Sequence, residues 1–201
     1  GDFVGNREPR KATGVTDSKV EVTIEDTTSK LPTHYFDVSN KQNVLSGTIA
    51  ADGSLVLKVY FKKKMPLTIT ASSATREYNG QPLTQPEYEV TFAEKTYKAE
   101  ATGIPSVNSK YQVTLDNGDI VQASTTGTIT NVGNTSNIID VNDAPKIMRD
   151  GVEITEQYKI TIVDGELEIT KRPVTITATD SGKTYGDEDP AFVNATMSGQ
   201  V

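Results

Sequence analysis

The chain repeats one short stretch at a spacing of 107 residues. Residues 66–71 read Pro-Leu-Thr-Ile-Thr-Ala, and residues 173–178 read Pro-Val-Thr-Ile-Thr-Ala. Tyr78 and Tyr185 follow the two stretches at the same distance. A self-match at one long, fixed period is typical of tandem domains. The repeat therefore predicts a series of units rather than one large core.

The period divides the chain into three parts. One complete unit is expected at residues 65–172, because the second copy starts at Pro173. Residues 1–64 are expected to form a separate β module, and residues 173–201 the truncated start of the next unit. The link between the units is short, and Pro173 restricts its own φ and the backbone of the residue before it. Such a joint favours a stiff rod over a flexible string.

The residue mix predicts strands almost everywhere. Thr, Val and Ile together account for 61 residues, whereas Leu accounts for 8. β-branched side chains suit a pleated, half-buried surface, and a clean 3.6-residue apolar period is missing over any stretch of about a dozen residues. We predict a mainly β chain of tandem domains without long helices. The repeat unit is expected to be an Ig-like β-sandwich, with β-grasp-like as the alternative for the first module.

Apolar alternation places the strands. In the first module it predicts a strand over residues 20–25, a hairpin joining Ser46–Ala50 to Ser54–Lys62 across Asp52-Gly53, and one helical turn near residues 39–44. In the unit it predicts the strands 67–71, 88–92, 97–102, 111–115, 120–130, 158–162 and 167–169. The last two are expected to form a hairpin across Asp164-Gly165. About seven short strands separated by turn residues are typical of a β-sandwich.

Charge and composition exclude several classes of partner. The net charge of −7 disfavours nucleic acid, whose phosphates need a clustered positive surface. We interpret the basic run Lys62-Lys63-Lys64 as a solvated strand end. The sequence has no cysteine, which rules out disulfides and thiolate metal sites. No apolar run approaches membrane-spanning length, so no membrane insertion is expected in this segment.

Residues for catalysis are sparse. His34 is the one histidine, and no Ser or Asp near it matches a known triad spacing. Nucleophile-elbow, P-loop and dinucleotide motifs are missing as well. We expect His34 to be structural or at the surface. The sequence predicts no enzyme, no cofactor, and no catalytic, cofactor-binding or metal-binding residue, and it assigns no ligand-binding residue.

Two other features invite a binding interpretation. Acidic loops at residues 116–119, 140–143 and 187–189 gather oxygen ligands, but none follows the twelve-residue calcium loop. Because Asp and Asn also favour turns for backbone reasons, we interpret them as turns. Tyr78 and Tyr185 occupy equivalent positions and could stack on sugars. We expect them to be packing anchors instead, since each copy of a fold needs its anchors.

The repeat unit resembles the MBG-type (YDG-type) repeats of bacterial surface proteins. The resemblance rests on residues 66–71 with Tyr78-Asn79-Gly80, and on the stretches 127–133, 151–158 and 164–170. Residues 184–190 match the YGD variant of the same opening. Together these stretches cover roughly residues 66–201.

The first module is similar to the closing hairpin of mucin-binding-like (MucBP-like) modules. The similarity lies in residues 43–49 and 52–60 and covers about residues 14–64. It departs at the front, where no convincing strand precedes Val20. The module is therefore expected to lack its first strand.

These resemblances imply a function at the cell surface. They imply a large, wall-attached adhesin or stalk protein of Gram-positive bacteria, extracellular and anchored through regions outside this segment. We expect a structural stalk segment that contacts its neighbouring repeats. The alternatives are a module that binds host mucin or glycans weakly, or an accessory domain of a secreted glycosidase.

The repeat period predicts that residues 65–172 fold as an isolated fragment. The fragment should be a soluble, all-β monomer with a cooperative unfolding transition, because it holds one complete unit. Circular dichroism during thermal unfolding measures both properties. A random-coil spectrum would contradict the domain division.

Overall fold

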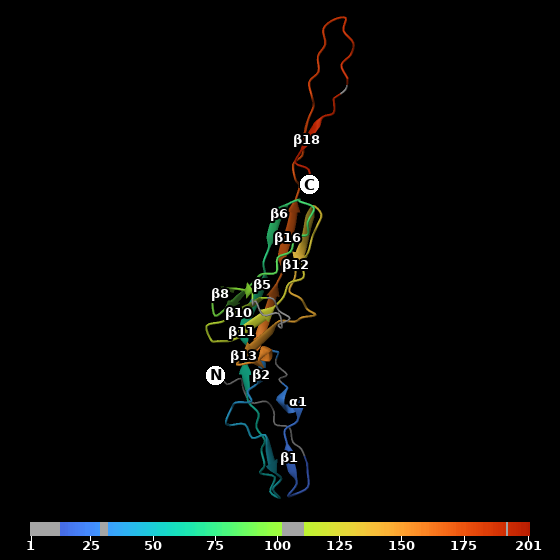
Figure 1. Ribbon diagram of the computed structural model, residues 1–201. Helices are drawn as coiled ribbons and strands as arrows, with labels where there is room; N and C mark the ends of the chain where they lie inside the picture. The colour runs from blue at the N-terminus through green and yellow to red at the C-terminus, as the bar shows by residue number, and fades with distance from the viewer. Residues whose placement is uncertain (1–12, 29–31, 102–110, 192) are drawn as a thin grey trace.

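The computed structural model describes residues 13–28, 32–101, 111–191 and 193–201. The described residues form a mainly β, elongated molecule with several separate sheets (Figure 1). Its helical segments are the single turn α1 (Ile24–Thr27) and the 3₁₀ turn η1 (Thr155–Gln157). Neither of these described helices has the length or apolarity needed to cross a membrane. The predicted mainly β class without long helices is confirmed.

The first module contributes two small sheets at one end of the molecule (Figure 1). Its strands pair as β1 with β3 and β2 with β4, both antiparallel. They are β1 (Lys19–Glu21), β2 (His34–Phe36), β3 (Ser46–Thr48) and β4 (Phe61–Lys63).

Several predictions for this module were wrong. The strand expected at residues 20–25 ends at Glu21, because Thr23 starts α1 with a capping box in which its side chain and that of Asp26 bond each other's backbone N–H. The hairpin across Asp52-Gly53 keeps its turn but is reduced to one bridge between Val44 and Lys58, and β3 pairs with β1. The turn expected near residues 39–44 is held by separate turn bonds rather than a helix.

The unit at residues 65–170 contains three sheets. Its strands are β5 (Met65–Ala71), β6 (Ala74–Glu77), β7 (Tyr88–Phe92), β8 (Lys95–Lys98), β9 (Glu100–Ala101), β10 (Tyr111–Thr114), β11 (Ile120–Ala123), β12 (Gly133–Asn137), β13 (Lys146–Arg149), β14 (Val152–Glu153), β15 (Tyr158–Val163) and β16 (Gly165–Thr170). The sheet orders are β15-β5-β7-β8, β14-β13-β11-β10-β9 and β12-β16-β6.

The core lies between the first two of these sheets. It combines Leu67, Ile69 and Val90 from the β15-β5-β7-β8 sheet with Val121 and Ile147 from the other, all nearly inaccessible to solvent. Side chains from two facing sheets therefore fill one interior, as in a sandwich. Strands β6, β12, β13 and β14 were not predicted, because their sequences are short or lack apolar alternation.

Some predicted strands have different limits. The strand expected over residues 120–130 stops at Ala123, after which single bridges join Thr125 to Ile139 and Ile129 to Leu83. The strand expected over residues 97–102 corresponds to β8 and β9, and Thr102 lies outside the described residues.

The first and last long strands of the unit run parallel to each other. β5 pairs with β15 from Met65–Tyr158 to Thr70–Val163, and β6 pairs with β16 from Ala74–Leu167 to Glu77–Thr170. Both pairings have the same offset, so β5–β6 and β15–β16 are two long, interrupted strands side by side. The chain enters the unit at one end of this pair and leaves at the other (Figure 1).

The predicted hairpin across Asp164-Gly165 is therefore wrong: β15 and β16 continue in one direction. The physical reason for the glycine is a close approach and not a reversal. A Cβ on Gly165 would lie 2.5 Å from the carbonyl oxygen of Ala71 and 2.6 Å from that of Ser72. Gly165 does not have a positive φ. The absent side chain lets the two long strands stay in contact through the interruption.

The tail forms an antiparallel pair from β17 (Thr175–Thr177) and β18 (Thr196–Ser198). Its register, with Ile176 opposite Met197, equals that of Ile69 opposite Val90 in the β5–β7 pair after a shift of 107 residues. Ile69 is fully buried, whereas Ile176 is 65% exposed. The apolar face of β17 that carries Ile176 is therefore exposed, and the pairing with β18 is a contact that sequence analysis did not predict.

Replacing Gly165 with Ala should destabilise the unit by about 1–3 kcal/mol, because the added methyl overpacks two backbone carbonyls. Gly182→Ala, in the tail, is the control for a methyl group that meets no atom within 4 Å. Urea unfolding followed by circular dichroism measures both variants. Equal midpoints for the two would contradict the role assigned to Gly165.

Candidate functional site

His34 begins β2 and is buried, with 8% of its surface exposed. Its Nδ1 lies 3.0 Å from the hydroxyl of Thr33. Among the described residues, its Nε2 has no hydrogen-bond partner. A buried imidazole of this kind can fill space in the first module.

A buried carboxylate lies directly after the last residue of β2 and bonds other parts of the first module. Asp37 is 6% exposed, and its carboxylate accepts a hydrogen bond from the Ser39 hydroxyl at 2.6 Å. The Lys62 ammonium lies 3.0 Å away. The Ser39 hydrogen bond first, and then Lys62, lower the pKa of Asp37 against the opposing effect of burial. Lys62 of the basic run is therefore partly neutralised by a structural partner.

The acidic turn at residues 116–119 contains the most buried charge of the described unit. Asp119 is fully buried, and its carboxylate accepts hydrogen bonds from Arg149 Nε at 2.6 Å and Arg149 Nη2 at 2.7 Å. It also accepts hydrogen bonds from the Tyr158 hydroxyl and from Asn117 Nδ2. The cluster joins the β10–β11 turn to β13 and to the start of β15.

Burial and hydrogen bonding within this cluster shift the pKa values of Asp119 and Tyr158. Burial raises the pKa of Asp119, but the hydrogen bonds from Arg149, Tyr158 and Asn117 outweigh it, so that the net pKa lies below its ordinary value. Burial, with the hydrogen bond to Asp119, raises the pKa of Tyr158 to about 12. Both groups therefore keep one protonation state near neutral pH, which suits a structural ion pair better than proton transfer.

The other acidic loops bond their own backbone or nearby side chains. The carboxylate of Asp140 accepts the N–H of Asn142 at 2.8 Å, and Asp143 accepts a hydrogen bond from Ser124 at 3.3 Å. In the loop at residues 187–189, Asp189 pairs with Lys183. Within the described ranges, no three His, Cys, Asp or Glu side chains gather as metal ligands.

The buried hydroxyl of Tyr88 is fully hydrogen-bonded. The Tyr88 hydroxyl accepts the N–H of Ala123 at 3.1 Å and lies 3.1 Å from the carbonyls of Tyr111 and Val121. Burial raises the pKa of this hydroxyl well above its ordinary value. It ties β7 in one sheet to β10 and β11 in the other.

The buried side chain of Asn137, at the end of β12, also has both its polar atoms hydrogen-bonded. Its Nδ2 donates to the carbonyls of Ser72 and Gln85, both at 2.8 Å, and its Oδ1 accepts the N–H of Gly127 at 3.1 Å. Sequence reasoning missed Asp119, Tyr88 and Asn137 as key residues. An isolated Asn or Asp in a turn-rich sequence carries no signal of burial.

The two repeat-equivalent tyrosines are not core anchors, contrary to the expectation. Tyr185 is completely exposed, and Tyr78 is half-buried at the end of β6. The backbone N–H of Tyr78 donates to the carbonyl of Thr170 at 3.0 Å, which extends the β6–β16 pairing by one residue. The buried tyrosines of the described unit are instead Tyr88 and Tyr158. The position 107 residues after Tyr88 is occupied by Ala195 and not by a tyrosine.

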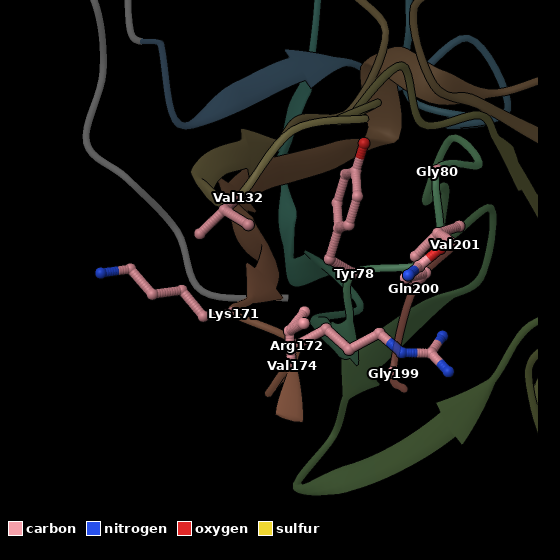
Figure 2. A pocket seen from close by; sticks show the side chains of 9 residues that line it. All are labelled: Tyr78, Gly80, Val132, Lys171, Arg172, Val174, Gly199, Gln200 and Val201. Carbon is pink, nitrogen blue, oxygen red and sulfur yellow. The ribbon is translucent and has the colours of Figure 1, made fainter. Parts of the chain in front are cut away.

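Tyr78 lines an open hollow of about 470 Å³ where the unit meets the tail. The hollow is also lined by Lys171, Arg172, Val174 and Val201. Figure 2 shows the side chains of Tyr78, Lys171 and Arg172 pointing in different directions rather than toward one point. Arg172 Nε lies 3.7 Å from Glu77. Such diverging polar groups form a joint surface and not the convergent set that a ligand needs.

No family model, curated protein or solved structure matches the chain.

Asp119→Asn should lower the free energy of unfolding at pH 7 by about 2–3 kcal/mol, because Arg149 loses its buried partner. This loss of stability is smaller than that expected for a fully buried ion pair, because the Arg149 side chain is 43% exposed and partly solvated. A depressed pKa in the folded state means that Asp119 stabilises the fold above about pH 4 and loses this effect as the pH falls further.

The variant should therefore lose less stability than the natural chain between pH 7 and pH 3. Denaturant unfolding at both pH values measures this difference. Asp116→Asn on the same turn is the control, because that side chain is exposed and pairs with Lys95 at the surface. An equal effect of the two variants at pH 7 would contradict the structural role of Asp119.

Proposed function

We propose that this chain is a structural spacer in the stalk of a bacterial cell-surface protein, which projects a more distant part of that protein or takes part in adhesion. The observation that carries the proposal is the parallel pairing of β5–β6 with β15–β16. It makes the chain enter and leave the unit at opposite ends. Repeated units of this kind extend in a line.

Length supports this interpretation. Residues 65–77 form an almost uninterrupted strand, and at about 3.3 Å per residue they span roughly 40 Å. The parallel partner covers the same distance. A unit of about a hundred residues thus contributes its long dimension to the length of the rod.

The joints on both sides are short. Only Lys64 separates β4 from β5, and its backbone N–H donates to the carbonyl of Thr33 at 2.7 Å. β2 of the first module also contacts η1 at the start of β15. Four residues separate β16 from β17, and Arg172 pairs with Glu77 there. Short, bonded joints limit bending between neighbouring parts.

The resemblance to MBG-type and MucBP-like modules adds the cellular setting. Under this proposal the chain is extracellular, attached to the wall of a Gram-positive bacterium through other regions, and not an enzyme. The diverging side chains of the hollow near Tyr78 favour a spacer over a tight glycan receptor.

Small-angle scattering and glycan binding together test the proposal. A compact chain of 201 residues has a radius of gyration of about 16–17 Å. The rod should exceed this value clearly, and a value near it would contradict the spacer. Any binding to mucin or glycans should be weak, with dissociation constants of about 0.1–1 mM, and gain avidity only in longer arrays.

A glycan array followed by calorimetry on residues 1–201 separates the two functions. Tyr185→Ala tests the exposed ring, and Tyr185→Phe is the matched control that keeps an aromatic ring at the same exposed position. A single saturable ligand in the low micromolar range, lost in Tyr185→Ala or Tyr78→Ala, would favour a glycan-binding module over the spacer.

A further inference from the structure

The direction of the two long strands determines how the unit responds to tension. β5 leads into the unit, and β16 leads out of it at the opposite end. A pull on both ends drags β5–β6 and β15–β16 in opposite directions along their own length. We propose that the unit bears tension along the rod, and that the contact between these two long strands, here called the clamp, is the part that carries the load.

The clamp loads many bonds at the same time. It contains six paired positions between β5 and β15 and four between β6 and β16. Bonds in a parallel ladder are evenly spaced along the strands and connect one strand to the other at a slant. A force along the strands therefore shears all of them together, whereas a force across the strands would break them one after another.

Each long strand is also held on its second side over one of its two halves. β5 lies between β15 and β7, and β16 lies between β12 and β6. Ile69 and Leu167 are fully buried, so water reaches this part of the ladder poorly. A slip of one residue would move these side chains to the opposite face of their sheets. Sliding is therefore opposed by the core in addition to the hydrogen bonds.

The break in the clamp is reinforced. At the interruption after Ala71, the N–H of Glu166 donates to the Ser73 hydroxyl at 2.9 Å. Asn137 holds the Ser72 carbonyl from the side at 2.8 Å. The first bond joins the two long strands where the ladder is absent, and the second holds the first long strand to the end of β12.

The tail provides an internal contrast. β17 and β18 are antiparallel and share three paired positions. The start of β17 and the end of β18 lie at the same end of this pair, so a pull on those ends opens the bonds one at a time. The same chain thus holds a sheared contact and a peeled contact.

This inference rests on the proposed rod function for its biological meaning, but the strand geometry alone determines its mechanical content. A chain that scatters as a compact particle would remove the spacer function without changing the force measurement. A low rupture force for the clamp in a chain that scatters as an extended particle would contradict this inference but would not contradict the spacer function.

Pulling single molecules from two pairs of engineered cysteines tests the clamp in the full chain of 201 residues. The chain has no natural cysteine, so the two introduced thiols are the only sites at which the pulling linkers attach. Lys64→Cys with Lys171→Cys pulls the clamp in shear. Lys64→Cys with Glu156→Cys pulls at the paired ends of β5 and β15 and peels the same bonds.

Both variants release about 30–35 nm of chain when the unit opens, which identifies the event. The shear pair should need a several-fold larger force than the peel pair. Equal thermal unfolding of the two variants shows that the difference comes from the direction of pulling. Equal forces in the two directions, or a smaller force in shear, would overturn the proposal.

Discussion

The parallel pairing of the first and last long strands is the contact on which the rest of the unit depends. It joins residues 93 positions apart in sequence, and each of the two strands also bonds a second neighbour. The buried face of β5 then supplies one wall of the sandwich core. Because both ends of the unit belong to this pair, the same contact sets the fold, the direction of the chain and the spacing of the joints.

Buried polar groups fix the geometry that apolar packing leaves open. Tyr88 connects the two facing sheets through backbone groups of β10 and β11, and Asn137 bonds the loops next to the break in the long strand. Asp119 connects a turn to β13 and β15 through Arg149 and Tyr158. Each of these groups is costly to bury unless its partners are in place. They therefore specify one arrangement of the sheets.

The strand class and the β5 and β7 segments could be predicted because β-branched residues alternate there with period two. The parallel return of β15–β16 could not, since Asp164-Gly165 has the same letters as a hairpin turn and differs only in what packs against it. The start of α1 at Thr23 had a readable capping signal, which strand alternation masked. For the candidate site, charge and composition excluded several classes of chemistry, whereas the burial of Asp119 and the exposure of Tyr185 depend on tertiary contacts.

The identical register of β5–β7 and β17–β18 has a consequence for how such a chain folds. Each short-range pair can form as soon as about thirty residues are available, whereas β15 must close a loop of about ninety residues, which costs more entropy. Until it does, β5 and β17 present the same open edge with nearly the same sequence. An arriving last strand then has two competing acceptors, and swapping between neighbouring units becomes the characteristic misfolding route. The different residues opposite β17 and β5, such as Met197 in place of Val90, are the features that distinguish the two acceptors.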